Sequence, residues 1–137
     1  MNREIKFRGK RLDNGMWIYG DLMQHQDGDV YVGDNTRYWT DDGYHNNNYE
    51  EVRAVDDETV GQYTGLKDAK GREIYEDDIL GCPEDCDFLP EAVIFTEGCF
   101  MVKDDYTTTA MHAIDTQYRT IIGNIHDNPE LLEGGAK

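Results

Sequence analysis

The segment from Thr59 to Leu80, TVGQYTGLKDAKGREIYEDDIL, constrains the fold more than any other part of the chain. Residues 60–65 alternate with the two-residue period of a β-strand. The run Asp68-Ala69-Lys70-Gly71 then supplies a turn acceptor and a glycine for a left-handed backbone position, and Ile74-Tyr75 resumes a strand pattern. The segment therefore predicts two strands joined by a tight reversal. It indicates an architecture and carries no recognisable catalytic apparatus.

Strand patterns also occur before and after this segment. Near the N-terminus, alternating residues on both sides of Asn14-Gly15 predict a hairpin with a two-residue turn. In the second half, short β-favouring runs flank Glu97-Gly98 and continue to residue 125. Asp127 to Glu130, with its proline, is typical of the start of a short helical turn. The sequence thus predicts an all-β protein made mainly of antiparallel strands.

Three blocks of the sequence, in this order, resemble the YopX family of phage and prophage proteins. They are REIKFRGKRLDNGMWIYGDL (Arg3 to Leu22), the segment from Thr59 to Leu80, and IIGNIHDNPELL (Ile121 to Leu132). Asp77 stands where the family usually has the glycine of a Glu-Gly-Asp tripeptide, and aspartate tolerates left-handed backbone better than most residues. The resemblance implies a small SH3-like barrel, and it brings no established activity, catalytic residue or cofactor.

The resulting prediction is an SH3-like barrel with an added N-terminal β-hairpin or meander and a short C-terminal helical turn. The length of 137 residues suits one domain, residues 1–137. Two β subdomains sharing that length are the alternative: a meander over residues 1–56 with a long loop at 36–51, and the barrel over 57–132. Residues 133–137 are expected to form a flexible tail.

The composition predicts a folded, cytoplasmic protein, and the YopX resemblance implies that the cytoplasm is that of a bacterial host. Nine tyrosines, four phenylalanines and two tryptophans oppose disorder, because disordered chains are poor in aromatic residues. No apolar run approaches the roughly 18 residues of a membrane span, and charges occupy the place of a signal peptide's apolar region.

The net charge of −16 is unevenly distributed. Residues 1–12 carry about +4, which leaves about −20 for the remainder. Such an acidic chain repels phosphate backbones, so direct nucleic-acid binding is disfavoured and a basic partner surface is favoured. A plainer interpretation is that the acidity serves solubility while the basic strand pairs with acidic neighbours.

Aromatic residues supply the candidate partner-binding positions. The segment 36–51 shows no sustained period and is predicted to be a long loop, in which Tyr38, Trp39, Tyr44 and Tyr49 lie among small polar residues, as in binding loops. A disordered or crystal-contact loop is the alternative. A calcium site is a third option, because the segment offers side-chain oxygens, but it lacks the frame of a calcium-binding loop. Trp17 and Tyr19 extend the set, although large residues on a strand also serve to cover a core.

Metal binding and catalysis are both disfavoured. Zinc binds cysteine and histidine side chains, which this chain offers at Cys82, Cys86, Cys99, His112 and His126. Only one close cysteine pair exists, however, and its acidic neighbours disfavour the thiolate form that binds zinc. A disulfide is disfavoured because the predicted setting is reducing. Glu76, Asp77 and Asp78 are adjacent, and adjacent residues of a strand point to opposite faces, so they cannot converge on one substrate atom as an acid–base pair. The chain also has no serine and no recognisable catalytic motif. We therefore expect no cofactor and no enzymatic activity.

Two functional hypotheses follow. The first is a phage-encoded interaction module that binds a host or viral protein, including one that itself binds nucleic acid. The second is a structural or self-assembling accessory protein, a homo-oligomer in which the basic N-terminal strand of one copy docks on the acidic surface of the next.

Overall fold

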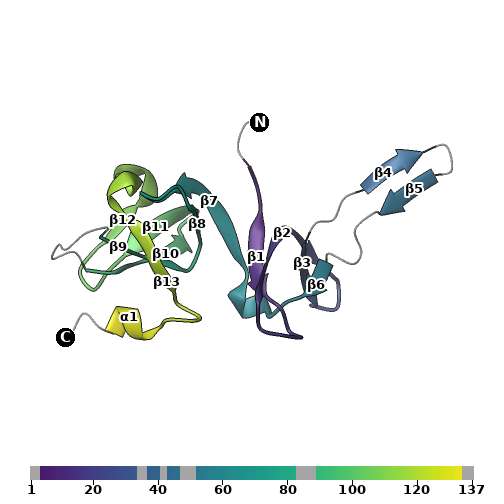
Figure 1. Ribbon diagram of the computed structural model, residues 1–137, viewed down its shortest axis with the longest axis horizontal. Coiled ribbons are helices and arrows are strands. Elements are labelled where there is room, and N and C mark those ends of the chain that lie inside the picture. The colour runs from purple at the N-terminus through teal and green to yellow at the C-terminus, as the bar shows by residue number, and fades with distance from the viewer. Residues whose placement is uncertain (1–3, 34–36, 41–42, 47–51, 83–88, 134–137) are drawn as a thin grey trace. The chain divides into compact units, whose positions relative to one another are not determined.

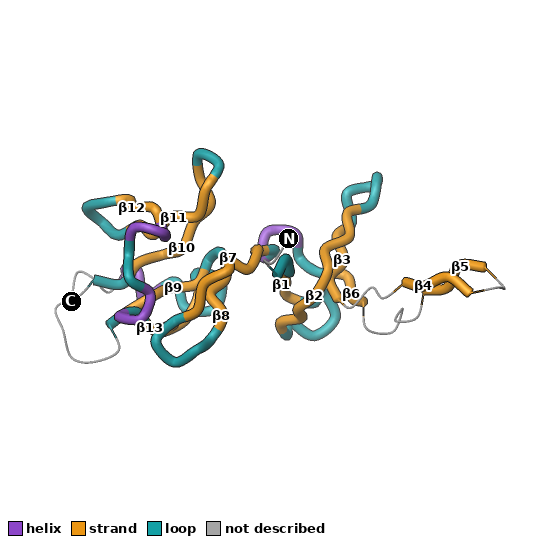
Figure 2. Tube along the Cα trace, turned by 90° about the horizontal axis from the view of Figure 1, so that it is seen from above, coloured by secondary structure: helices purple, strands orange, loops and turns teal. Residues whose placement is uncertain are grey.

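The computed structural model describes residues 4–33, 37–40, 43–46, 52–82 and 89–133. Antiparallel strands dominate it, and helices are limited to short turns (Figures 1 and 2). The all-β prediction is therefore confirmed. Strands β4 (Arg37–Thr40) and β5 (Gly43–Asn46) form a two-stranded sheet of their own.

The larger of the other two sheets has six strands in the order β6-β3-β2-β1-β7-β8. Their bounds are β1 Phe7–Lys10, β2 Trp17–Gln24, β3 Val30–Gly33, β6 Val52–Ala54, β7 Gly61–Lys67 and β8 Glu73–Tyr75.

The second sheet has five strands in the order β12-β11-β10-β9-β13. Their bounds are β9 Asp78–Gly81, β10 Glu91–Thr96, β11 Cys99–Lys103, β12 Thr108–Ala110 and β13 Thr120–Asn124. The pairings of the described strands do not close into a barrel, so the SH3-like barrel over residues 57–132 stays a prediction.

In the described residues, the helical segments are one short α-helix and three 3₁₀ helices. They are α1 (Glu130–Glu133), η2 (Asp57–Thr59), η3 (Met111–Ala113) and η4 (Thr116–Tyr118). The predicted C-terminal helical turn is thus confirmed. Within the described ranges, no helix is long and apolar enough to cross a membrane.

The chain forms two compact units, Met1–Gln62 and Tyr63–Lys137. Strand β7 contributes to both, because its first two residues pair with β1 whereas its later residues pair with β8. In the first unit, Val32 and Val55 are buried, and Gly9 lies so close to Val55 that an added Cβ would stand 2.9 Å from a valine methyl carbon. This close approach explains a glycine in the middle of β1.

The core of the second unit is aliphatic. Ile74, Leu80, Val93, Val102 and Met111 are buried together, and half-buried side chains that include Phe100 and Ile121 pack against them. These residues come from β8 to β13 and η3, so the reversal predicted at residues 68–71 delivers β8 directly into this core.

Asp68 holds that reversal in place. Its side chain is fully buried and accepts hydrogen bonds from the backbone N–H groups of Lys70, Arg72 and Ile121, each at 2.9 Å. The guanidinium of Arg72 lies 3.0 Å from the same carboxylate. Gly71 takes the left-handed backbone with φ +80°. One carboxylate therefore joins the β7–β8 turn to β13, which begins 52 residues later in the sequence, at Thr120.

The stability of the chain is expected to depend on pH through Asp68. Burial opposes ionisation of this carboxyl, but the N–H donors of Ile121, Arg72 and Lys70 and the charge of Arg72 outweigh it and lower the pKa below its ordinary value. A lowered folded-state pKa contributes stability above the unfolded pKa of about 4, and this contribution is lost as the pH falls through the folded pKa. We expect the difference in unfolding free energy between wild type and Asp68→Asn to shrink on acidification, as measured by urea denaturation at neutral and acidic pH. A difference independent of pH would contradict this role.

Three local predictions need correction. Segment 36–51 is not a continuous loop, because β4 and β5 pair within it, with Trp39 opposite Tyr44. Lys10 pairs with Trp17, so six residues rather than two connect β1 to β2, and the Arg11 N–H donates to the Met16 carbonyl oxygen within that connection. The single strand expected at residues 74–80 is broken by a turn at 76–77. Residues 134–137 of the predicted tail lie outside the described residues.

Candidate functional site

Trp17 and Tyr19 lie on one face of the β1–β2 pair in the first unit. The antiparallel register places Trp17 opposite Lys10 and Tyr19 opposite Arg8. Opposite residues of two strands share a face, so these four side chains form one surface, which we call the β1–β2 aromatic face. The opposite face carries the pair Gly9 and Ile18 and lies toward Val55.

Cation–π contacts fix the tryptophan of this face. The Arg8 guanidinium lies 4.5 Å from the centre of the Trp17 ring, and the Lys10 ammonium lies 5.7 Å from it. Arg8 is only 5% exposed and Trp17 is half-buried. Such contacts contribute about 0.5–2 kcal/mol each, depending on desolvation. The half-buried Trp17 therefore covers a buried cation.

Tyr19 is the more accessible aromatic residue of the pair. Half of its surface is exposed (50%), although it lies in the middle of an eight-residue strand. A tyrosine on a regular strand has few rotatable bonds and combines an apolar ring with a hydroxyl group, which makes it a low-entropy contact residue.

The other aromatic candidates lie on or beside the β4–β5 hairpin. Tyr38 is opposite His45, and Trp39 is opposite Tyr44 in the register of the two strands. Tyr49 falls outside the described residues. The structure thus places two of the six candidates on the aromatic face and three on the backbone of a separate two-stranded sheet.

The basic residues of the N-terminal segment have partners close by in the sequence. Arg11 binds Asp13 through two hydrogen bonds of 2.9 and 2.7 Å, and Lys6 lies 3.3 Å from Glu4. The Arg11 bond lowers the pKa of Asp13. Together with the burial of Arg8, these contacts fit the interpretation that the basic strand is neutralised locally.

The comparison with family models accounts for nearly the whole chain. The model described as YopX protein matches residues 6–133. The chain belongs to the YopX family. The match includes β1, β2, the Asp68 turn and α1, so the aromatic face and both sheets lie within the YopX domain.

A solved structure supports the fold of this YopX chain. The crystal structure of protein EF1440 from Enterococcus faecalis is similar, with a TM-score of 0.61 and 23% sequence identity, and the alignment covers 96% of this chain and 99% of that one. A search of curated proteins found no match. At this identity the similarity establishes the fold alone.

The departure from the YopX pattern at Asp77 is accommodated as expected. Asp77 adopts φ +75°, the left-handed conformation that a glycine would take there. Its carboxylate lies 2.9 Å from Nε2 of His126, and its backbone carbonyl accepts a hydrogen bond from Ile125. Asp78 points elsewhere and accepts from the Tyr75 N–H. The Asp77–His126 pair joins the β8–β9 turn to the end of β13. The two residues are 49 apart in the sequence, so no local pattern predicts this contact.

The described members of the zinc set considered from the sequence, Cys82, Cys99, His112 and His126, do not form a metal-binding group. Cys82 forms a disulfide bond, which corrects the expectation against one; that expectation rested on an assumed compartment rather than on geometry. Cys99 is a free, half-buried thiol, and Cys86 lies outside the described residues. Among the residues that the structure describes, no group of three or more His, Cys, Asp or Glu side chains could hold a metal ion.

Arg8 and Lys10 are site residues that sequence reasoning missed. The sequence shows them only as positive charges, whereas the strand register places them in cation–π contact with the Trp17 ring. The alternation of Arg8 and Lys10 along β1 carried this signal, because it places both on the face opposite Gly9.

Proposed function

We propose that this YopX chain is a non-enzymatic phage or prophage protein that acts by binding a host or viral protein. The observation that carries the proposal is the β1–β2 aromatic face, where half-exposed Tyr19 lies beside a Trp17 held by two cations. Tyrosine, tryptophan and arginine are the residue types that dominate binding energy at protein interfaces. The aromatic-rich β4–β5 hairpin supplies a second contact element in the same unit.

Tyr19→Ala should weaken capture of the partner at least about tenfold, because it removes an exposed anchor without opening the core. The measurement is affinity capture from an infected host lysate, with nuclease treatment and quantitative mass spectrometry. Tyr118→Ala is the matched control, since Tyr118 is 68% exposed and lies in the second unit. The double variant Tyr38→Ala/Trp39→Ala tests the hairpin in the same way.

Equal recovery of every protein by wild type and by Tyr19→Ala would refute the role of this face. Thermal unfolding of both baits keeps the comparison sound, because a variant that melts like wild type has lost a contact and not its fold. Loss of capture with the Tyr118→Ala control would also count against the proposal.

Self-assembly through the basic N-terminal strand has less support. That model needs cations available for a second copy, whereas Lys6 and Arg11 already pair with Glu4 and Asp13. Light scattering at low salt decides between the two, because an electrostatic homo-oligomer persists at low salt and dissociates at high salt.

A further inference from the structure

The five-stranded sheet has an outer face opposite the side chains of its core cluster, and of the outer-face residues Ala92 is buried. Val93 pairs with Val102, and both are buried, so the opposite face carries the alternate pairs Ala92 with Lys103 and Ile94 with Met101. This outer face continues to β12, because Met101 pairs with Ala110 and Lys103 pairs with Thr108. Ile94 and Met101 are half-buried there.

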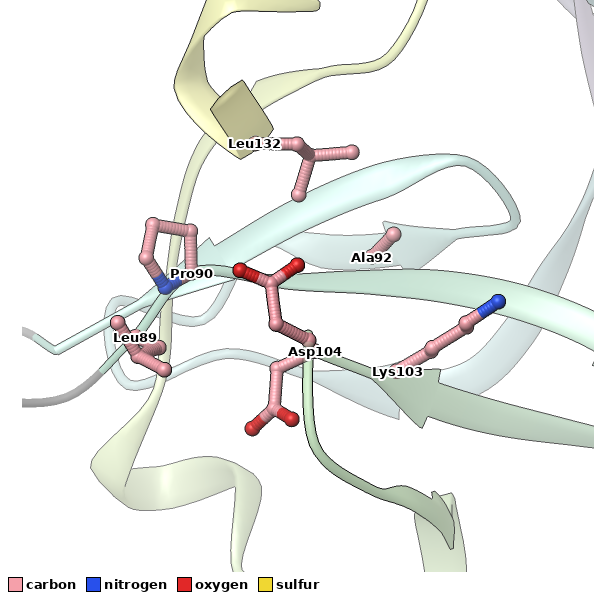
Figure 3. Close-up of a pocket in the computed structure, with 7 residues that line it drawn as sticks. Leu89, Pro90, Ala92, Lys103, Asp104 and Leu132 are labelled. Atoms are coloured by element: carbon pink, nitrogen blue, oxygen red, sulfur yellow. The ribbon is translucent and has the colours of Figure 1, made fainter. Parts of the chain in front are cut away.

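Two adjoining hollows mark the outer face. One, of about 200 Å³, is lined by Leu89, Pro90, Ala92, Lys103, Asp104, Asp105 and Leu132 (Figure 3). The other, of about 400 Å³, is lined by Ile94, Thr96, Glu97, Met101, Lys103 and Thr108. Lys103 lines both hollows. We call the surface that carries the two hollows the β10–β12 groove.

The end of the groove near α1 has aliphatic walls. Figure 3 shows Leu132 of α1 together with Leu89 and Pro90, which precede β10, around the hollow. The position of α1 is fixed by close packing, because a Cβ on Gly123 would lie 2.8 Å from Cδ1 of Leu131. The Asn128 side chain accepts from the Asn124 N–H and holds the segment that leads into the helix.

The rim of the groove is predominantly acidic. Asp104, Asp105 and Glu97 contribute three carboxylates, against the single ammonium of Lys103 among the groove residues. In Figure 3 the Lys103 side chain extends away from Asp104. The N–H groups of Tyr106 and Thr107 donate to Oδ1 of Asp104 at 2.8 Å and lower the pKa of its carboxyl, which is therefore ionised at neutral pH.

We propose that the β10–β12 groove binds an extended segment of a partner protein in which apolar residues alternate with arginine or lysine. Charge complementarity selects this occupant, because the rim is acidic and the chain as a whole carries a net charge of −16. Arginine and lysine have apolar stems and charged ends, which match aliphatic walls of Leu89, Pro90 and Leu132 leading to Asp104 and Asp105. Apolar residues of the segment contact Ile94 and Met101. The inference rests on the proposed interaction role and names the chemistry of a second contact surface.

The test is a titration of the ¹⁵N-labelled full chain with two capped peptides, Leu-Arg-Leu-Arg-Leu and its charge-reversed counterpart Leu-Glu-Leu-Glu-Leu. The basic peptide should cause saturable shifts at the amides of Ala92, Lys103 and Asp104, and the acidic peptide should cause none. Asp105→Lys should weaken binding about fivefold or more at low salt, because it replaces an attraction by a repulsion. Leu132→Ala should weaken it by removing an aliphatic wall.

Glu58→Lys is the matched control, since it changes the net charge equally but lies in the first unit. Retained affinity in Glu58→Lys with loss in Asp105→Lys supports the groove. Equal loss in both variants means unspecific attraction to an acidic protein and overturns the proposal, as does equal binding of the two peptides or a set of shifts confined to residues 4–62. The peptide titration tests binding by the second unit, and the Tyr19→Ala capture experiment tests binding by the first. A negative result for the groove is therefore distinguishable from a negative result for the proposed function.

Discussion

Replacing Asp68 by alanine is expected to lower the free energy of unfolding by about 3–5 kcal/mol, the usual cost of removing one partner from a buried charged network. The substitution removes a fully buried carboxylate and leaves the N–H groups of Lys70, Arg72 and Ile121 without their acceptor. It also removes the carboxylate that neutralises the Arg72 guanidinium. Urea denaturation followed by far-ultraviolet circular dichroism measures the loss.

Asp13→Ala is the control for this prediction. Asp13 also binds an arginine through two hydrogen bonds and also has a lowered pKa, but it is exposed, so water replaces the lost carboxylate. We expect a far smaller effect. If Asp13→Ala and Asp68→Ala destabilise the chain equally, burial is not what makes Asp68 important, and its role as the tie between the turn and β13 is wrong.

Gly20→Ala is expected to destabilise the first unit by about 3 kcal/mol or more, because it combines overpacking with backbone strain. Gly20 has φ +147°, and an added Cβ would lie 2.5 Å from the backbone carbon and oxygen of Gly33. Backbone atoms cannot turn aside as a flexible side chain does, so β2 and β3 must separate. Tryptophan fluorescence in a urea titration reports on this unit, because Trp17 and Trp39 both belong to it.

Gly28→Ala is the control that separates backbone strain from overpacking. Gly28 also has a positive φ, +97°, but nothing lies within 4 Å of the position its Cβ would take. It should therefore cost only the backbone term, on the order of 1 kcal/mol. A Gly20→Ala variant as stable as Gly28→Ala would show that the β2–β3 contact relaxes without loss.

Local turn chemistry was predictable from the sequence. At residues 68–71 an aspartate that accepts N–H groups precedes a glycine that takes positive φ, and both requirements are visible in the letters of the chain. The turn at Glu97-Gly98 is similar, since both residues adopt positive φ between β10 and β11. Asp77 also followed a local rule, because aspartate is one of the few residues that accept the left-handed conformation.

The error at residues 36–51 has a physical cause. Asp, Asn and Gly are depleted in strands, and a two-stranded hairpin can form without a buried face to impose an alternating apolar pattern. The length of the β1–β2 connection was misjudged for a related reason. Asn14-Gly15 does place Gly15 at positive φ, but the connection closes through backbone hydrogen bonds from Arg11 to Met16 and from Gly15 to Arg11, so Lys10 and Trp17 are the last residues paired as strands.

The candidate site residues were also only partly predictable from the sequence. The alternation of residues after Gly15 singled out Trp17 and Tyr19, because it sets both large side chains on one face of a strand, where they cover either a second layer or a partner. Their unequal roles required the register, which sets Trp17 over Arg8 and Lys10 and leaves Tyr19 half exposed. The β10–β12 groove required more still, since Pro90, Lys103 and Leu132 come together from three separate parts of the chain.

The sequence by itself determined the strand-rich character, the tight turns and the YopX resemblance, because period-two alternation and positive-φ residues act over a few neighbours. Only the tertiary structure decided that Asp68 binds Ile121, that Asp77 meets His126, and that Arg8 is buried beneath Trp17. The physical reason is that these contacts join residues far apart in the chain or depend on which strands pair. Strand pairing is set by the packing of whole sheets, and no local pattern specifies it.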